Sequence, residues 1–154
     1  MISEYAAEHL RSVWIAIFLR KGAIGKHTNS FSAIEHQDRA MIQSSVLFEN
    51  DELPVLVSVP RTGTWTMLTT KHLIMHNAEN CKSLRLENIY RAKMDLRKME
   101  TMGITKSHLA NIQILSNEGN SYDLELEAGA SCIGFLNVLM HIARLNRDRA
   151  KRVL

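Results

Sequence analysis

Histidine is the residue type in this sequence that first suggests metal chemistry, because seven histidines occur among its 154 residues. His72 and His76 are four positions apart, which is the spacing of a zinc-binding pair on a helix. We interpret this segment as a strand, however, and four residues at ~3.3 Å each place the two side chains about 13 Å apart. Two imidazoles at that distance share a face but cannot bind one ion. We therefore expect structural or solvent-exposed histidines and no metal site.

Nucleophilic catalysis is the second chemistry to consider, since the chain contains two cysteines, Cys81 and Cys132. Cys132 and His141 fall on one predicted helix, but nine positions of separation place them about 180° apart around its axis. This excludes a catalytic dyad between them. The sequence also lacks a Gly-x-Ser-x-Gly elbow, and residues 21–26 lack the spacing and the preceding strand of a phosphate-binding loop. We expect packed thiols, no cofactor and no enzymatic activity.

An acidic strip runs along the last predicted strand, where Asp123, Glu125 and Glu127 occupy alternate positions. Alternate strand residues are ~6.6–7 Å apart, and these three carboxylates are predicted to face solvent. A solvated strand face is therefore expected rather than a calcium site or a general-acid cluster. The strip accompanies a basic strand with Arg91 and Lys93 and a basic C-terminal tail. Such a polarised surface steers charged partners.

The composition is that of an ordinary globular protein, with 45% hydrophobic, 23% charged and 6% aromatic residues. These values exclude a disordered chain, a collagen-like chain and a disulfide scaffold. A net charge of +3 does not by itself indicate nucleic acid, and aromatic residues do not interleave with the basic ones. The longest apolar run, residues 13–19, is far shorter than the roughly 20 residues that cross a bilayer. Acidic residues precede this run, unlike in a signal peptide, so we expect a cytoplasmic protein.

Hydrophobic spacing predicts two helices in the first 48 residues. Ser3 is the expected cap of a helix that continues to about Arg20. A second helix is expected over residues 32–48, where Ser32 and Glu35 have the spacing of a capping box. A short glycine-containing break separates the two helices.

From Leu53 onward the hydrophobic period changes from 3.6 to 2, which predicts strands. Seven are expected, near residues 55–59, 64–69, 72–76, 82–86, 90–96, 109–115 and 122–127, with a loop over 97–107. After Gly129 a helix is expected from residue 130 to about Arg147. Its apolar residues spread over roughly 240°, more than one sheet face covers, and a polar strip remains at Gly134, Asn137, His141 and Arg144. We expect the surplus to contact the N-terminal helix or a partner subunit.

Three short motifs within this strand-rich region indicate a family. They are a second-hairpin motif at residues 66–74 (TMLTTKHLI), a strand motif at 84–89 (LRLENI) and a last-hairpin motif at 115–122 (LSNEGNSY). With these motifs, residues 49–145 resemble the bacterial pleckstrin-homology-like and GRAM-like domains. The resemblance implies an α+β fold, a seven-stranded antiparallel β-sandwich or open barrel capped by the C-terminal helix. Residues 1–48 then form a helical N-terminal extension packed on a pleckstrin-homology-like domain of residues 49–154.

The family resemblance implies a scaffold that binds lipids, peptides or proteins. This fold does not itself imply an enzyme. We therefore expect a non-enzymatic protein-binding module, with an immunity protein or inhibitor that neutralises a partner as the specific hypothesis. A homo-oligomer is also considered. The contact residues expected for a basic partner are Glu118, Asp123, Glu125 and Glu127. Trp65 is interpreted either as a packed residue or as an interface anchor.

The alternative function is a peripheral membrane or phospholipid-binding module that uses Arg61, Lys71, Arg91 and Lys93. Attraction to an anionic membrane is worth about 1 kcal/mol for each well-placed basic residue. Phosphoinositide-binding relatives carry several basic residues in the loop between the first two strands, whereas this loop offers only Arg61. A hydrolase with an unrecognised site is the third alternative.

Overall fold

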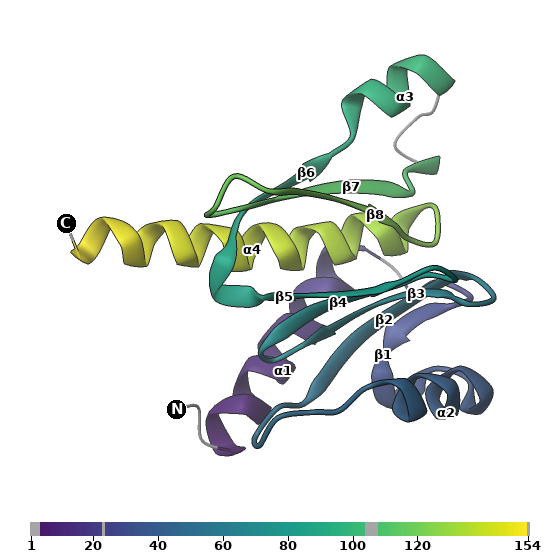
Figure 1. Cartoon of the computed structure of the whole chain (residues 1–154), viewed down its shortest axis with the longest axis horizontal. Coiled ribbons are helices and arrows are strands. Elements are labelled where there is room, and N and C mark those ends of the chain that lie inside the picture. Colours follow the sequence, from purple (N-terminus) through teal and green to yellow (C-terminus); the bar gives the residue numbers. More distant parts are fainter. Residues whose placement is uncertain (1–3, 23, 104–107, 154) are drawn as a thin grey trace.

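The structure is a computed structural model that describes residues 4–22, 24–103 and 108–153 (Figure 1). It has an α+β fold with two antiparallel sheets that do not close into a barrel. The first sheet has the order β1-β2-β3-β4-β5, from Thr28–Ser30, Pro54–Arg61, Thr64–Thr69, His72–His76 and Cys81–Arg85. The second has the order β6-β7-β8, from Ile89–Met94, Asn111–Ser116 and Ser121–Glu125. The prediction of antiparallel sheets followed by a C-terminal helix is confirmed.

Two tight turns connect neighbouring strands into antiparallel hairpins. Gly63 between β2 and β3 has a φ of 81°, and Gly119 between β7 and β8 has a φ of 85°. Glycine adopts this left-handed region without the steric cost that a side chain adds. The turns give the registers Ser58↔Thr66 and Ile114↔Tyr122. Both hairpins lie where the sequence predicts them.

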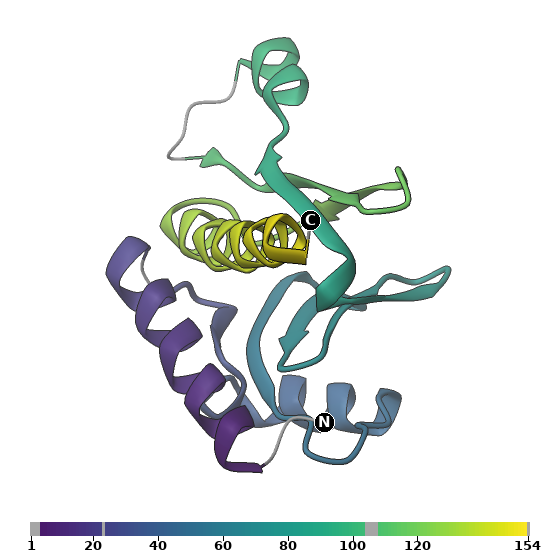
Figure 2. The same ribbon diagram turned by 90° about the vertical axis from the view of Figure 1, so that its left-hand side faces the viewer.

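Four helices accompany the sheets in the described part of the chain: α1 (Glu4–Lys21), α2 (His36–Ser45), α3 (Leu96–Met102) and α4 (Ala130–Val153). Helix α4 lies between the two sheets in both views, and α1 packs beside it (Figures 1 and 2). The main core combines α1, α4 and residues from both sheets, so the wide apolar face of α4 is covered from several sides. The expected contact between α4 and the N-terminal helix is confirmed.

A second core lies on the other face of the five-stranded sheet. Phe31, Ile34 and Ile42 pack there against Val57, Val59, Trp65, Met67 and Ile74. Helix α2 and the preceding 3-10 turn, Phe31–Ala33, cover this face (Figure 1). Strand β2 is therefore buried on both faces, and its sequence is a continuous apolar run broken by Ser58.

The N-terminal segment departs from the sequence-based expectations. The described residues form eight strands rather than seven, because Thr28–Ser30 pairs with β2 and extends the sheet from within residues 1–48. Three residues are too few to produce a period-2 pattern, which explains the omission. The helix expected over residues 32–48 is shorter, and its cap is Glu35 without a side-chain hydrogen bond, so the capping box is wrong. The expected cap of α1, Ser3, lies outside the described residues.

Three further expectations change farther along the chain. The loop expected over residues 97–107 contains α3, while residues 104–107 lie outside the described part. Helix α4 continues beyond Arg147 to Val153. Cys132 is buried as expected, but Cys81 is exposed on the edge strand β5, which corrects the expectation of a packed thiol. Among the described helices, none has both the length and the apolar character required to cross a membrane.

Candidate functional site

A groove of about 470 Å³ lies where α1, α4 and β6 meet. Five cationic side chains line it, and together they define the basic groove: Arg20, Lys21, Arg91, Arg144 and Arg147. None of the described residues that line the groove is acidic. The remaining lining is apolar or neutral: Ile17, Ala92, Asn137, Met140, His141 and Ala143. The groove therefore concentrates positive charge beside apolar and neutral polar side chains.

Three elements bring these charges together for separate local reasons. Arg20 and Lys21 are the basic residues in the last turn of α1. On α4 each groove residue lies three or four positions from another groove residue, so together they form one stripe along the helix. This stripe includes Asn137, His141 and Arg144 of the predicted polar strip, whereas the fourth member, Gly134, is buried where α4 packs on α1. Arg91 is supplied by β6, against which α4 packs.

Arg147 is fixed by contacts with Tyr90 on the neighbouring strand. Its guanidinium donates a 2.6 Å hydrogen bond to the Tyr90 carbonyl oxygen and lies 5.8 Å from the centre of the Tyr90 ring. Asn146 donates to the carbonyl oxygens of Leu86 and Ile89 at 2.7 and 2.8 Å. These bonds attach the C-terminal half of α4 to the start of β6, so one end of the groove is preorganised.

His141 is the neutral member of the groove. Its Nδ1 lies 3.2 Å from a guanidinium nitrogen of Arg144. Burial and the neighbouring Arg144 charge both lower the pKa of His141 below its ordinary value. The imidazole is therefore uncharged at neutral pH, and the positive charge comes from the arginines and the lysine.

The basic groove has the chemistry of an oxyanion-binding surface. Four of its five cations are arginines, whose planar guanidinium groups bind carboxylates and phosphates through paired hydrogen bonds. Exposed apolar side chains accompany it: Met140 lines the groove, and the Tyr90 ring contacts the groove residue Arg147. The combination suits a ligand that carries both negative charge and apolar surface.

The acidic strip does not form a continuous surface of unpaired carboxylates. Glu125 forms a 2.5 Å ion pair with Arg61, which joins β8 to β2. Glu127 accepts hydrogen bonds from the His27 amide on both carboxylate oxygens, at 3.1 and 3.0 Å. Asp123 and Glu118 are exposed. Two of the four expected contact residues therefore hold parts of this chain together.

The residues of the phospholipid alternative are also dispersed. Arg61 is paired with Glu125, and Lys71 lies 3.7 Å from a carboxylate oxygen of Glu49. Lys93 is exposed on β6. Arg91 is the member of this set that lines the basic groove.

Trp65 is fully buried in the second core beneath α2. Its ring stacks on His76 with centroids 4.9 Å apart and planes inclined by 5°. This is a packing role, and the ring is not exposed to a partner.

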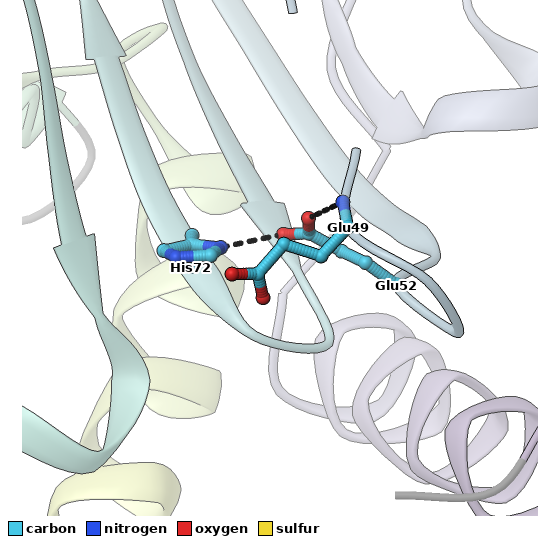
Figure 3. A group of neighbouring side chains, drawn as sticks. All are labelled: Glu49, Glu52 and His72. Carbon is cyan, nitrogen blue, oxygen red and sulfur yellow. Dashed lines mark hydrogen bonds and ion pairs between the residues drawn. The ribbon is translucent and has the colours of Figure 1, made fainter. Parts of the chain in front are cut away.

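A second cluster of polar groups forms where the segment before β2 meets the β3–β4 turn (Figure 3). The Glu52 carboxylate, whose side chain is 1% exposed, accepts hydrogen bonds from the Glu49 amide at 2.8 Å and from the Thr69 hydroxyl. His72 Nδ1 lies 2.7 Å from Glu52 Oε2, the oxygen that also accepts from Thr69, whereas the Glu49 amide binds Oε1. Burial alone raises the pKa of Glu52, but these hydrogen bonds and the His72 interaction together lower it below its ordinary value. We name Glu49, Glu52 and His72 the carboxylate–histidine cluster.

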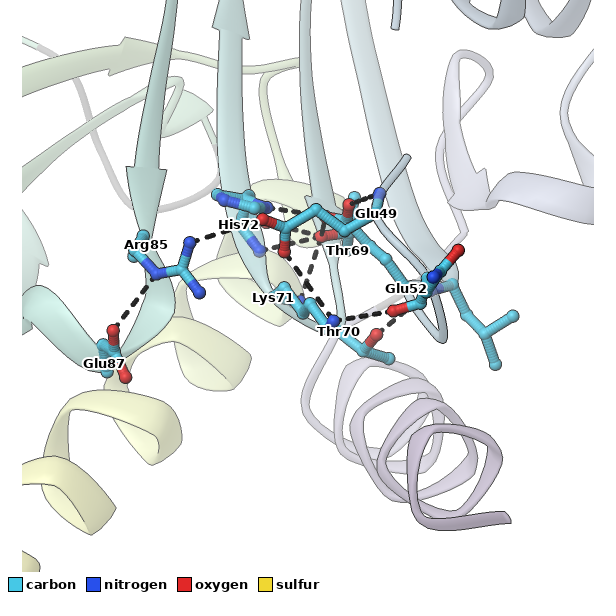
Figure 4. A network of polar contacts seen from close by, with 10 residues as sticks. Glu49, Glu52, Thr69, Thr70, Lys71, His72, Arg85 and Glu87 are labelled. Carbon is cyan, nitrogen blue, oxygen red and sulfur yellow. Dashed lines mark hydrogen bonds and ion pairs between the residues drawn. The ribbon is translucent and has the colours of Figure 1, made fainter. Parts of the chain in front are cut away.

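Basic residues surround this cluster (Figure 4). The Glu49 carboxylate lies 3.7 Å from Lys71 Nζ and 3.5 Å from a guanidinium nitrogen of Arg85. Sequence reasoning missed the cluster because it considered His72 with His76, four positions away, rather than with residues across the sheet. The signal was available in the predicted hairpin, which places the segment before β2 beside the end of β3.

Known proteins give no further assignment, since the sequence matches no protein-family model and no relative is found among curated proteins.

Proposed function

We propose that this protein is a non-enzymatic binding module that engages an acidic surface of a partner protein through the basic groove. The observation that carries this proposal is the gathering of five cationic side chains around one groove without an acidic residue in its described lining. Side chains of like charge repel one another, so an anionic partner that neutralises them is favoured at this place.

The scaffold we propose is a pleckstrin-homology-like domain over residues 49–145. The order of elements supports it: four antiparallel strands, β2 to β5, are followed by the three of β6 to β8 and then by α4. Strand β1 and helix α2 are additions from residues 1–48, and they cover the edge and the outer face of the first sheet. The groove then lies between the terminal helices and β6, on the side away from α2.

A protein partner is favoured over a lipid surface by the shape of the groove. It is a depression between two helices and a strand, and the exposed apolar side chain of Met140 lines it. Protein interfaces combine apolar anchors with charged groups in this way. An inhibitor or immunity protein is the specific role we propose, because such a protein acts by occupying its partner.

A groove variant with a matched control tests the proposal. We would replace Arg91 and Arg144 by Glu, and compare this with the Lys151→Glu, Arg152→Glu variant, which makes the same charge change at exposed sites on α4. Each protein would be immobilised and exposed to cell lysate and, separately, to vesicles of phosphatidylserine and phosphatidylcholine. We expect a stoichiometric acidic protein that the groove variant loses and the control retains.

Two outcomes contradict the proposal. A partner retained by the Arg91→Glu, Arg144→Glu variant at wild-type affinity removes the groove as the contact surface. Vesicle binding that depends on Arg91 and Arg144, without a protein partner, replaces the proposal by the phospholipid-binding alternative. Circular dichroism of each variant verifies that the fold is intact.

A further inference from the structure

We propose that Glu49, Glu52 and His72 form a binding site for one divalent transition-metal ion of the Zn²⁺ class. One ligand atom from each of the three residues lies within 4.8 Å of the other two. Metal–ligand distances of about 2.0–2.2 Å place neighbouring ligands of a tetrahedral ion about 3.4 Å apart. The three groups therefore need only small movements to contact one ion, and water supplies the remaining ligand. The inference is independent of the function proposed for the basic groove.

The donor set suits such an ion. Carboxylate oxygens and an imidazole nitrogen are both ligand types that bind zinc and neighbouring transition metals. The cluster differs from the His72 and His76 pair that the sequence suggested, because its imidazole is combined with carboxylates from another segment. His76 instead stacks on Trp65. The site therefore takes one histidine rather than two.

Buried neighbours hold the central ligand in place. Glu52 and Thr69 are both buried, and the Thr69 hydroxyl and Glu49 amide each bind an oxygen of the Glu52 carboxylate. The adjacent Leu53 amide donates to Thr70 Oγ1 at 3.0 Å, which fixes this segment against the β3–β4 turn. Hydrogen bonds from such outer groups orient metal ligands and raise their affinity.

Glu49 can turn toward an ion without leaving its basic neighbours unpaired. Its ion pairs with Lys71 and Arg85, at 3.7 and 3.5 Å, are longer than the 2.7–2.9 Å typical of strong charge-assisted bonds. Lys71 Nζ also donates to the Asn50 carbonyl oxygen at 2.7 Å, and Arg85 Nε also binds Glu87 at 3.1 Å. Each cation therefore keeps a partner when Glu49 coordinates a metal (Figure 4).

Calorimetric titration of the full chain with ZnCl₂, and separately with MnCl₂, tests this inference. We expect one ion to bind per chain. Glu49→Gln should weaken Zn²⁺ binding by about tenfold or more, and His72→Gln should weaken it further. Glu49 is exposed, so its substitution leaves the fold intact even if the His72 variant is unstable.

Matched controls separate this site from incidental binding at surface histidines. His36→Gln and Glu79→Gln remove an exposed imidazole and an exposed carboxylate outside the proposed site, and both should bind Zn²⁺ as the wild type does. Absence of stoichiometric binding of either ion overturns the inference. Binding that Glu49→Gln leaves unchanged, or that His36→Gln abolishes, overturns it as well and leaves the cluster as an ion-pair network.

Discussion

Residues of the same type differ in solvent exposure in ways that the sequence does not indicate. Cys132 is buried, and burial raises the pKa of its thiol to about 12, whereas Cys81 is exposed on an edge strand. The Glu52 carboxylate is buried but satisfied by hydrogen bonds, while the nearby Glu49 carboxylate is half exposed. Reactivity and titration at these residues therefore report directly on the fold.

The two thiols should react at very different rates with a thiol reagent such as Ellman's reagent at pH 8. Cys81 should react at once, because it is exposed, and Cys132 only after unfolding, because its buried thiol does not ionise at this pH. One equivalent of fast reaction that Cys81→Ser abolishes is the expected result. Two fast equivalents in native buffer would show that the α4 packing described here is wrong.

Glu52 should make stability dependent on acid. Because its folded-state pKa is lowered, the stability it contributes is present above the ordinary value of 4.5 and is lost as pH falls through the lower folded-state pKa. Glu52→Gln should reduce the free energy of unfolding by about 1–3 kcal/mol at pH 7, measured by urea denaturation with a metal chelator present. The difference from wild type should shrink toward pH 3, and a difference that grows on acidification would contradict the assignment. Glu79→Gln, at an exposed turn, is the control.

His141 should couple anion binding to a proton. Burial and the positive charge of Arg144 both lower the pKa of His141. An anion bound in the basic groove offsets the Arg144 charge and so raises this pKa. An acidic peptide should therefore bind more tightly as pH falls from about 7 to about 5.5, and His141→Gln should weaken this dependence. Peptide titrations followed by fluorescence anisotropy measure it. The same pH dependence in His141→Gln and wild type would exclude His141 as the responsible group.

Helices α1 and α4 cross at a contact between small residues. A Cβ atom added to Gly134 would lie 2.8 Å from the Phe18 carbonyl oxygen and 3.1 Å from Gly22 Cα. Glycine therefore permits the close approach that places Arg20 and Lys21 beside α4. The N-terminal helix is thus required for the basic groove as well as for the core.

Gly134→Val should separate these helices. Overpacking of this kind costs about 1–3 kcal/mol, so the free energy of unfolding in urea should fall by that amount. Binding of an acidic peptide should also weaken, because α1 supplies two of the five groove charges. Ala150→Val, at an exposed position of α4, should change neither measurement appreciably. Wild-type stability for Gly134→Val would contradict the close crossing.

Helices and strands long enough to show a hydrophobic period could be predicted from the sequence, whereas the shortest elements could not. Helices α1 and α4 and the strands from β2 to β8 have enough residues for their hydrophobic period to be visible. Strand β1 has three residues, and its placement depends on pairing with β2 rather than on its own sequence. Helix α2 begins without the side-chain cap that Ser32 and Glu35 suggested, because Phe31 and Ile34 are anchored in the second core.

At the scale of the whole molecule, charges that are distant in sequence meet in one groove. The five cationic residues of the groove come from α1, β6 and α4, which are far apart in the sequence. No short sequence motif could therefore reveal that they lie together. The sequence indicated a polar strip on α4 but could not indicate that α1 and β6 face it. The acidic strip was visible in the sequence, yet its pairing with Arg61 and the His27 amide depends on the packing of the two sheets.

Titration of a labelled oligoglutamate peptide tests the central claim, the basic groove as the binding surface, most directly. Anisotropy should show saturable binding that weakens with salt and that Arg91→Glu, Arg144→Glu reduces by about tenfold or more. Lys151→Glu, Arg152→Glu, which carries the same net charge, should bind nearly as the wild type does. Equal weakening in both variants would show that only net charge matters, and would contradict a defined site in the groove.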